Sequence, residues 1–277
     1  MNNSKLLATF IGMLLFFSCA DNQKREQASN WTFKKEIQLP EIAPISVIAQ
    51  SKFLWLSDVD NNRVVKTDLD GKILEEYPGF QRPMHISMSH SIVYVPEYTA
   101  DTIKTIADKR VAIFPLLERP DAPAGIAVKD ETLAIADFYN HRVILQEGDA
   151  VSTFGKEGHQ AGELYYPTDV EIFNDKIFVA DAYNNRVQVF DKKGNSLAII
   201  GDKNGINVAT GLTLANDRLF VTDFFGNRIL VYDLEGNLKQ ILTEGFDNPT
   251  DISVVRNELF VTNYGNHSLA VYGLSLP

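Results

Sequence analysis

The chain lacks several features that would mark common protein classes. Its 277 residues include one cysteine, Cys19, so no internal disulfide can form. Basic residues are few, 26 against 36 acidic ones, and the resulting net charge of −10 argues against nucleic acid and anionic membrane surfaces as partners, because both are bound through basic patches. A phosphate-binding loop, a serine-nucleophile motif, HExxH and zinc-knuckle cysteines are also missing from the sequence.

A long hydrophobic run is missing as well. The most apolar segment, residues 6–17, follows Lys5 and is too short to span a bilayer comfortably, but it has the length of a signal-peptide core. Ser18 and Cys19 come directly after it, and this arrangement resembles a bacterial lipoprotein signal. The resemblance implies that residues 1–18 are removed and that Cys19 carries the lipid. The alternatives are an ordinary cleaved signal with an incidental cysteine, or an uncleaved anchor.

The next segment, residues 19–30, is polar and has no apolar periodicity, so it is predicted to be a tether. Residues 31–277 form the predicted folded domain. Hydrophobic residues make up 45% of the whole chain, which is sufficient for a large core. With the lipid resemblance, the expected location is the bacterial cell envelope. The domain would be a monomer anchored to a membrane and would face the periplasm or the exterior.

One phrase recurs along the chain. The sequence IFVADAYNNRVQVFDKKG from Ile177 contains an apolar run that ends in an acidic residue, a polar turn, a second apolar run and another turn. Six copies exist, and their marker residues lie 39 to 44 positions apart: Asp58, Glu97, Asp137, Asp181, Asp223 and Asn263. A period of about 40 residues with four short strands is typical of propeller blades.

The repeated phrase resembles NHL repeats, in which an apolar strand, an Asp, a turn with Asn-Arg and a second apolar strand follow one another. The resemblance covers roughly residues 45–274 and implies an all-β, six-bladed β-propeller of four-stranded blades. From the alignment of the repeats, the inner strands of blades 2 to 6 are expected to begin at His85, Gly125, Asp169, Gly211 and Asp251, with Pro44 as the approximate counterpart in blade 1.

Both ends of the repeat array are incomplete. Residues 32–39 are strand-like but have no partner in their own repeat, while the last repeat stops before its fourth strand. We therefore expect the N-terminal strand to pair with residues 269–272 and to close the ring, which removes two exposed sheet edges.

The acidic marker is followed five residues later by arginine in four of the six repeats. These pairs are expected to hold loops and blades together through charge-assisted hydrogen bonds, because a catalytic site is not repeated around a ring. The pairs are Asp58/Arg63, Asp137/Arg142, Asp181/Arg186 and Asp223/Arg228. His141 and His267 replace the turn asparagine on opposite sides of the ring and are expected to be exposed loop imidazoles.

Three polar residues occupy the start of alternating inner strands. His85, Asp169 and Asp251 come from blades 2, 4 and 6, so we expect them to converge at one mouth of the central channel. Imidazole and carboxylates about 120° apart are suitable ligands for a divalent metal, zinc or calcium, and Glu97 is expected near enough to serve as a further ligand or base. The alternative is that Asp169 and Asp251 cap turns while His85 fills space.

Two functional hypotheses follow. The first is a lipid-anchored binding or scaffold module for a protein, peptide or glycan. The second is a metal-dependent lyase or lactonase, since the alternating arrangement is similar to that of peptidyl-hydroxyglycine amidating lyases, six-bladed propellers that hold zinc with histidines from alternating blades. Metal analysis separates the two hypotheses.

Overall fold

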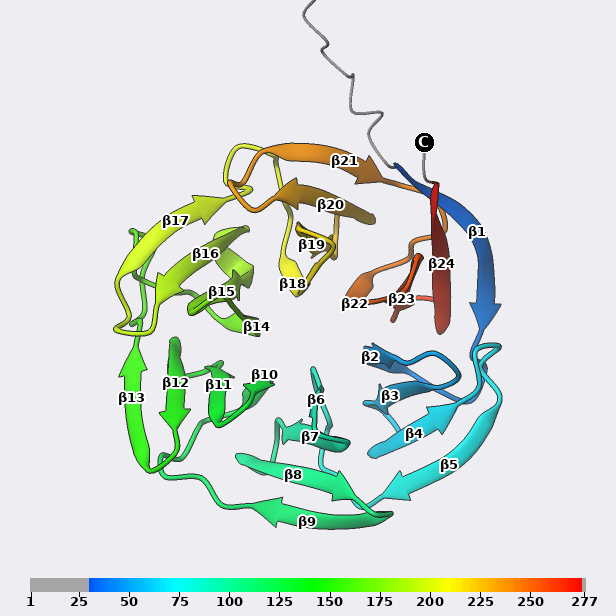
Figure 1. Ribbon diagram of the computed structural model, residues 1–277, viewed down its shortest axis with the longest axis horizontal. Helices are drawn as coiled ribbons and strands as arrows, with labels where there is room; N and C mark the ends of the chain where they lie inside the picture. Colours follow the sequence, from blue (N-terminus) through cyan, green and yellow to red (C-terminus); the bar gives the residue numbers. More distant parts are fainter. Residues whose placement is uncertain (1–29, 276–277) are drawn as a thin grey trace, which may run out of the picture.

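The computed structural model describes residues 30–275, in which six four-stranded antiparallel sheets surround a central axis as the blades of a propeller (Figure 1). The predicted fold is therefore confirmed. The predicted signal peptide and nearly all of the predicted tether lie outside the described residues. Within residues 30–275 the only helix is the 3-10 turn η1 (Ala182–Asn184), and no helix there has the length and apolar character needed to cross a membrane.

The strands of each blade occupy four equivalent positions from the axis outward. The inner strands are β2 (Pro44–Ala49), β6 (Ser87–Ser89), β10 (Pro123–Lys129), β14 (Pro167–Phe173), β18 (Ala209–Ala215) and β22 (Pro249–Val255). The second strands are β3 (Leu54–Asp58), β7 (Ile92–Glu97), β11 (Thr132–Asp137), β15 (Lys176–Asp181), β19 (Arg218–Asp223) and β23 (Glu258–Asn263). The third strands are β4 (Arg63–Thr67), β8 (Thr102–Ala107), β12 (Arg142–Glu147), β16 (Arg186–Asp191), β20 (Arg228–Asp233) and β24 (Ser268–Ser275). The outer strands are β5 (Ile73–Pro78), β9 (Arg110–Phe114), β13 (Ala150–Phe154), β17 (Ser196–Ile200), β21 (Leu238–Leu242) and, in blade 6, β1 (Asn30–Gln38).

Packing between neighbouring blades explains the strand compositions. The second strands are buried on both faces, as in β15, where all residues after Lys176 are buried. They are therefore apolar nearly throughout instead of alternating. The outer strands face solvent, and four of the five residues of β13 are exposed. The hydrophobic core thus consists of layers between adjacent blades, such as the cluster that contains Val179 and Phe190 of blade 4 with Leu145 of blade 3.

The two ends of the propeller differ. We call the end where inner strands begin and second strands finish the loop face, because there Pro167 pairs with Asp181 and the loop 182–185 follows. The opposite end, where inner strands turn back into second strands, is the hairpin face. In β1 the register places Gln38 opposite Ser268 at the loop face and Asn30 opposite Ser275 at the hairpin face.

The N-terminal strand closes the ring as predicted. Strand β1 pairs antiparallel with β24, with Phe33 opposite Tyr272 and Ile37 opposite Leu269 (Figure 1). The Gln240 side chain in blade 5 also holds β1, since its Oε1 accepts the amide of Trp31 at 3.0 Å and its Nε2 donates to the carbonyl of Trp31 at 2.8 Å. The strand is thus fixed to two blades at once.

The inner strand of blade 1 begins at Pro44 as predicted, but those of the other five blades begin elsewhere. Those of blades 3 to 6 start two residues earlier than expected, because their first residue, proline in three of them, already pairs with the end of the second strand before the register shifts. In blade 2 the regular strand starts only at Ser87, because the His85 amide donates to the Ala124 carbonyl of blade 3 at 3.1 Å instead of to its own sheet.

Removal of β1 tests the closure. A chain that begins at Glu41 loses the buried side chains of Trp31, Ile37 and Leu39, each worth about 1.5–3 kcal/mol, and exposes the edge of β24. We expect its free energy of unfolding to fall by roughly 5 kcal/mol or more relative to a chain that begins at Trp31. Urea unfolding measures the difference, and equal stability of the two chains would contradict closure by this strand.

Candidate functional site

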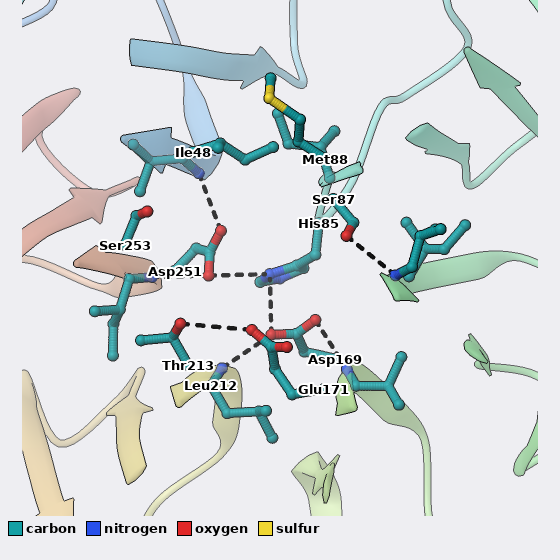
Figure 2. Close-up of a pocket in the computed structure, with 16 residues that line it drawn as sticks. Ile48, His85, Ser87, Met88, Asp169, Glu171, Leu212, Thr213, Asp251 and Ser253 are labelled. Carbon is teal, nitrogen blue, oxygen red and sulfur yellow. Dashed lines mark hydrogen bonds and ion pairs between the residues drawn. The ribbon is translucent and has the colours of Figure 1, made fainter. Parts of the chain in front are cut away.

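His85, Asp169 and Asp251 converge on the propeller axis from blades 2, 4 and 6 (Figure 2). The three residues are buried, with 4%, 5% and 6% of their surfaces exposed. His85 Nδ1 lies 3.8 Å from Asp169 Oδ2 and 3.8 Å from Asp251 Oδ1, and the three candidate ligand atoms all lie within 4.8 Å of one another. The group is therefore enclosed in the channel instead of exposed at its mouth.

Two glycines on the intervening blades allow this close approach. A Cβ on Gly125 of blade 3 would lie 2.7 Å from the Cα of Asp169 and 2.7 Å from the carbonyl oxygen of Thr168, which is closer than real contacts permit. Gly211 of blade 5 faces Asp251 in the same way. Glycine at these positions lets the following inner strand approach closely and brings each carboxylate toward the axis.

The two carboxylates also link neighbouring blades. Asp169 Oδ2 accepts the amide of Leu212 in blade 5 at 2.9 Å. Asp251 Oδ2 accepts the amide of Val47 at 3.0 Å and the hydroxyl of Ser46 at 2.5 Å, both in blade 1. The channel-facing edge of an inner strand has amides without a strand partner, and these carboxylates satisfy some of them. Each aspartate therefore bridges two blades in addition to any role as a ligand.

The His85 imidazole lacks such a partner. Within residues 30–275, Nδ1 of His85 is the buried side-chain nitrogen or oxygen that has no hydrogen-bond partner. A separation of 3.8 Å from each carboxylate oxygen is too long for a hydrogen bond. A buried polar atom without a partner costs about 1–3 kcal/mol. This atom and the two carboxylate oxygens together form a space in which a positively charged group would be stabilised.

The electrostatics of the group agree with this geometry. Burial alone lowers the pKa of His85, but Asp169 and Asp251 outweigh it and hold the pKa above its usual value. Burial raises the pKa of Asp169 to about 7, with His85 opposing the rise and Asp251 adding to it. Burial also raises the pKa of Glu171 to about 8, and the nearby Asp169 and Asp251 add to the rise. The channel therefore holds three acidic groups against one imidazole, and burial favours the neutral forms of Asp169 and Glu171.

A cavity of about 240 Å³ adjoins the group within the ring of inner strands. Its polar lining includes Glu171, Ser87, Thr213 and Ser253, and Met88 contributes an apolar side chain (Figure 2). Glu171 accepts a hydrogen bond from the Thr213 hydroxyl at 3.5 Å. Ser87, Glu171 and Ser253 lie two residues after His85, Asp169 and Asp251, and Thr213 lies two residues after Gly211, so the cavity extends from the group toward the hairpin face.

Glu97 does not belong to this group, and its prediction as a further ligand or base is wrong. Its carboxylate accepts the amide of Gln81 at 2.8 Å and the hydroxyl of Thr102 at 2.6 Å, and Lys104 Nζ lies 3.0 Å away. These contacts fix the second-blade loop in the way that aspartate does in the other blades. In blade 2 the pair of Glu97 and Thr102 therefore takes the place of the Asp/Arg pair of four other blades.

The repeated Asp and Arg residues form the expected pairs. In each, arginine Nε donates to the aspartate Oδ2 at 2.6 to 2.7 Å, and the aspartate is completely buried: Asp58/Arg63, Asp137/Arg142, Asp181/Arg186 and Asp223/Arg228. The second oxygen of each aspartate accepts an amide from the loop before the inner strand, as Asp181 does from Tyr165 at 2.7 Å. One carboxylate thus connects two loops of its blade.

Two sequence interpretations, those of His141 and Pro44, differ from the structure, and one residue of the site, Glu171, was missed. His141 is buried instead of exposed: its ring stacks on Tyr165 and Nδ1 accepts the amide of Tyr166 at 3.0 Å. Ser46, and not Pro44, is the blade-1 counterpart of Asp251. The sequence contained the evidence for this alignment, because Ser46 follows Pro44 by two residues just as Asp251 follows Pro249. Glu171 was identifiable as well, because strand alternation places it on the same face as Asp169.

Comparisons with known proteins agree with the fold. Residues 157–268 match a family model described as a 6-bladed beta-propeller. Over 68 residues, 24% of this chain, the sequence is 41% identical to protein lin-41 of Caenorhabditis elegans, and the stretch spans only 6% of that protein.

Solved structures extend the likeness to most of the chain. A catalytically inactive virginiamycin B lyase from Staphylococcus aureus, solved with quinupristin, is 20% identical, with a TM-score of 0.64 and coverage of 88% of this chain and 89% of that one. A protein of unknown function from Bacteroides thetaiotaomicron is 14% identical, with a TM-score of 0.70 and coverage of 90% and 76%. At these identities the likeness shows the six-bladed fold alone.

Substitution of one repeated aspartate tests the structural interpretation of the pairs. Asp181→Ala leaves the buried guanidinium of Arg186 without its partner, which costs about 3–5 kcal/mol. Urea unfolding should show that loss, whereas Asp149→Ala, at an exposed position in the turn before β13, should change stability by less than about 0.5 kcal/mol. If both variants are as stable as the native chain, the pairs do not hold the blades.

Proposed function

We propose that this protein is a ligand-binding propeller that holds a divalent cation in its axial channel through His85, Asp169 and Asp251. The observation that carries the proposal is the buried Nδ1 of His85, which has no hydrogen-bond partner and faces two carboxylate oxygens at equal distances of 3.8 Å. Two ligands that each lie about 2.1 Å from a metal ion are themselves roughly 3 to 4 Å apart. The two distances from His85 Nδ1 to the carboxylates therefore lie in the range that a shared cation requires, and all three atoms lie within 4.8 Å of one another.

The donor set favours a particular class of ion. One imidazole nitrogen with two carboxylate oxygens is suited to zinc or another first-row divalent metal, whereas calcium prefers six to eight oxygen ligands. The facing oxygen of Asp169 accepts the Leu212 amide at 2.9 Å, and that of Asp251 accepts the Ile252 amide at 2.7 Å. Such hydrogen bonds orient ligating carboxylates, and each oxygen retains a lone pair for the ion.

The cavity supplies the place for a ligand. A cation at the three residues would face the cavity that Glu171, Thr213 and Ser253 line, and it would supply positive charge there for an oxygen atom of a small molecule. Glu171 and the hydroxyls would then orient that molecule by hydrogen bonds. Binding is thus the first function that this geometry supports.

A second candidate is a lyase or lactonase at the same place. It is supported by the combination of a cation site with Glu171, a carboxylate whose pKa is raised by burial to about 8 and which could exchange a proton with a bound molecule. The shared fold with virginiamycin B lyase is compatible with this candidate. Turnover of a small molecule that depends on both the metal and Glu171 would distinguish it from binding alone.

Metal binding by the purified domain tests the first proposal. We expect one zinc or manganese ion per chain by metal analysis and a higher melting temperature when the ion is added, because an ion that binds only the folded state stabilises it. His85→Ala and Asp251→Asn should each abolish both effects, while the exposed His90→Asn should leave them unchanged. A domain that contains no metal and gains no stability from zinc, manganese or calcium would contradict the proposal.

We further propose that Cys19 anchors the domain to a membrane of the bacterial cell envelope. The support comes from the sequence before Cys19, which has the features of a lipoprotein signal. Strand β1 begins at the hairpin face, so a tether from Cys19 would reach the propeller from that side. The loop face would then point away from the membrane.

Substitution of the cysteine tests the anchor. In a bacterial cell the native chain should be found in the membrane fraction, and Cys19→Ser should be released or remain unprocessed, because stable anchoring depends on acyl chains at that residue. Fractionation followed by mass measurement of the N-terminus distinguishes the states. A Cys19→Ser chain of mature size that stays with the membrane would exclude lipidation at Cys19.

A further inference from the structure

Three exposed aromatic side chains stand at equivalent positions on the loop face. Tyr139, Tyr183 and Phe225 are the second residues after the repeated aspartates of blades 3, 4 and 5, and 51%, 53% and 61% of their surfaces are exposed. The corresponding positions of the other three blades hold Asp60, Thr99 and Gly265. The aromatic arc, as we call Tyr139, Tyr183 and Phe225, thus covers half of the ring and none of its members lines the axial cavity.

The backbone that carries the arc is fixed. The amides of Tyr139, Tyr183 and Phe225 donate to the carbonyls of Asp121, Tyr165 and Asn207 at 3.1 to 3.3 Å. The preceding aspartates are the buried members of the Asp/Arg pairs, which tie the same loops together. An aromatic side chain on a rigid loop loses little conformational entropy when it binds, so its exposure is suited to recognition.

Aromatic contacts continue between two of these blades. The ring of Tyr166 lies between those of Tyr139 and Tyr183, with centroid distances of 6.2 and 5.2 Å, and Tyr98 lies 5.8 Å from Tyr139. The guanidinium of Arg82 is 5.7 Å from the centroid of Tyr98. The protein therefore already places one cation over an aromatic ring at the edge of this surface.

Exposed carboxylates lie in the loops that hydrogen-bond to the backbone of the arc. Asp121, Glu157 and Asp202 are exposed in the loops that precede the inner strands of blades 3, 4 and 5. The same loops also contain basic residues: Arg119 is 3.2 Å from Asp101 and Lys156 is 3.3 Å from Glu163, so both are paired within the chain, whereas Lys203 is exposed beside Asp202. Rings with negative faces beside exposed carboxylates are complementary to lysine and arginine side chains.

We propose that the aromatic arc is a docking surface for a basic polypeptide, whose lysine or arginine side chains lie over the three rings while Asp121, Glu157 and Asp202 neutralise their charge. Aromatic residues are enriched at the centres of protein interfaces, where they contribute much of the binding energy. This proposal does not depend on the axial cation, because the arc and the cavity share no residues.

A charge-conserving comparison tests the docking surface. The probe is nona-arginine, with nona-glutamate as the negative peptide, and affinity is measured by calorimetry at low and at physiological salt. The triple variant Tyr139→Ser, Tyr183→Ser and Phe225→Ser should bind nona-arginine roughly tenfold or more weakly. The matched control replaces Val111, Ile113 and Leu197, exposed side chains of the outer strands, by serine and should bind within about twofold of the native chain, since net charge is equal in all three proteins.

Two results would overturn the proposal. Equal affinity of the arc and control variants would mean that nona-arginine responds only to net charge. Binding of a neutral oligosaccharide such as maltoheptaose that is independent of salt and lost in the arc variant would assign the surface to a glycan instead. If the triple variant does not fold, Tyr183→Ser alone carries the same comparison against Leu197→Ser, and melting temperatures equal to the native value establish that both are folded.

Discussion

Closure of the ring between β1 and β24 is the constraint on which the rest of the structure depends. It fixes blade 6 beside blade 1, where the Thr250 hydroxyl donates to the Pro44 carbonyl at 3.4 Å and Asp251 accepts the Val47 amide at 3.0 Å. Without this junction Asp251 would not be held at the axis, and the group with His85 and Asp169 would be incomplete. The pairing of β1 with β24 at the outer edge of blade 6 is thus needed to position the ligand group at the axis.

The loop face also combines structural residues with residues that are free to vary. Each buried aspartate of the repeat holds its arginine and a loop amide, so the loop between the second and third strands has a fixed backbone. Only the residues that point outward are free to vary among blades, and three of them are the aromatic side chains Tyr139, Tyr183 and Phe225. The uniform residues therefore provide a rigid frame, and we propose that the aromatic residues that vary among blades provide recognition.

The fold could be predicted nearly completely from the sequence, because six copies of a repeat of about 40 residues carry the same strand and turn pattern. The sequence also identified His85, Asp169 and Asp251, since alternation around a ring follows from blade order. Sequence reasoning failed at one residue whose partners lie in its own blade, Glu97, and at one contact between blades, that of His141. Glu97 was placed near the axis because it departs from the repeat, but Thr102 and Lys104 depart with it and satisfy it locally. The burial of His141 depends on Tyr165 of the next blade, a contact that no local pattern contains.

The central claim is that the axial group binds a cation, and anomalous-difference density from crystals grown with zinc tests it most directly. The account predicts one peak on the axis, about 2.0 to 2.2 Å from His85 Nδ1 and from one carboxylate oxygen each of Asp169 and Asp251. No density at that position, with the imidazole turned to donate a hydrogen bond to one of the carboxylates, would contradict it and would show that a proton is the only cation the group holds.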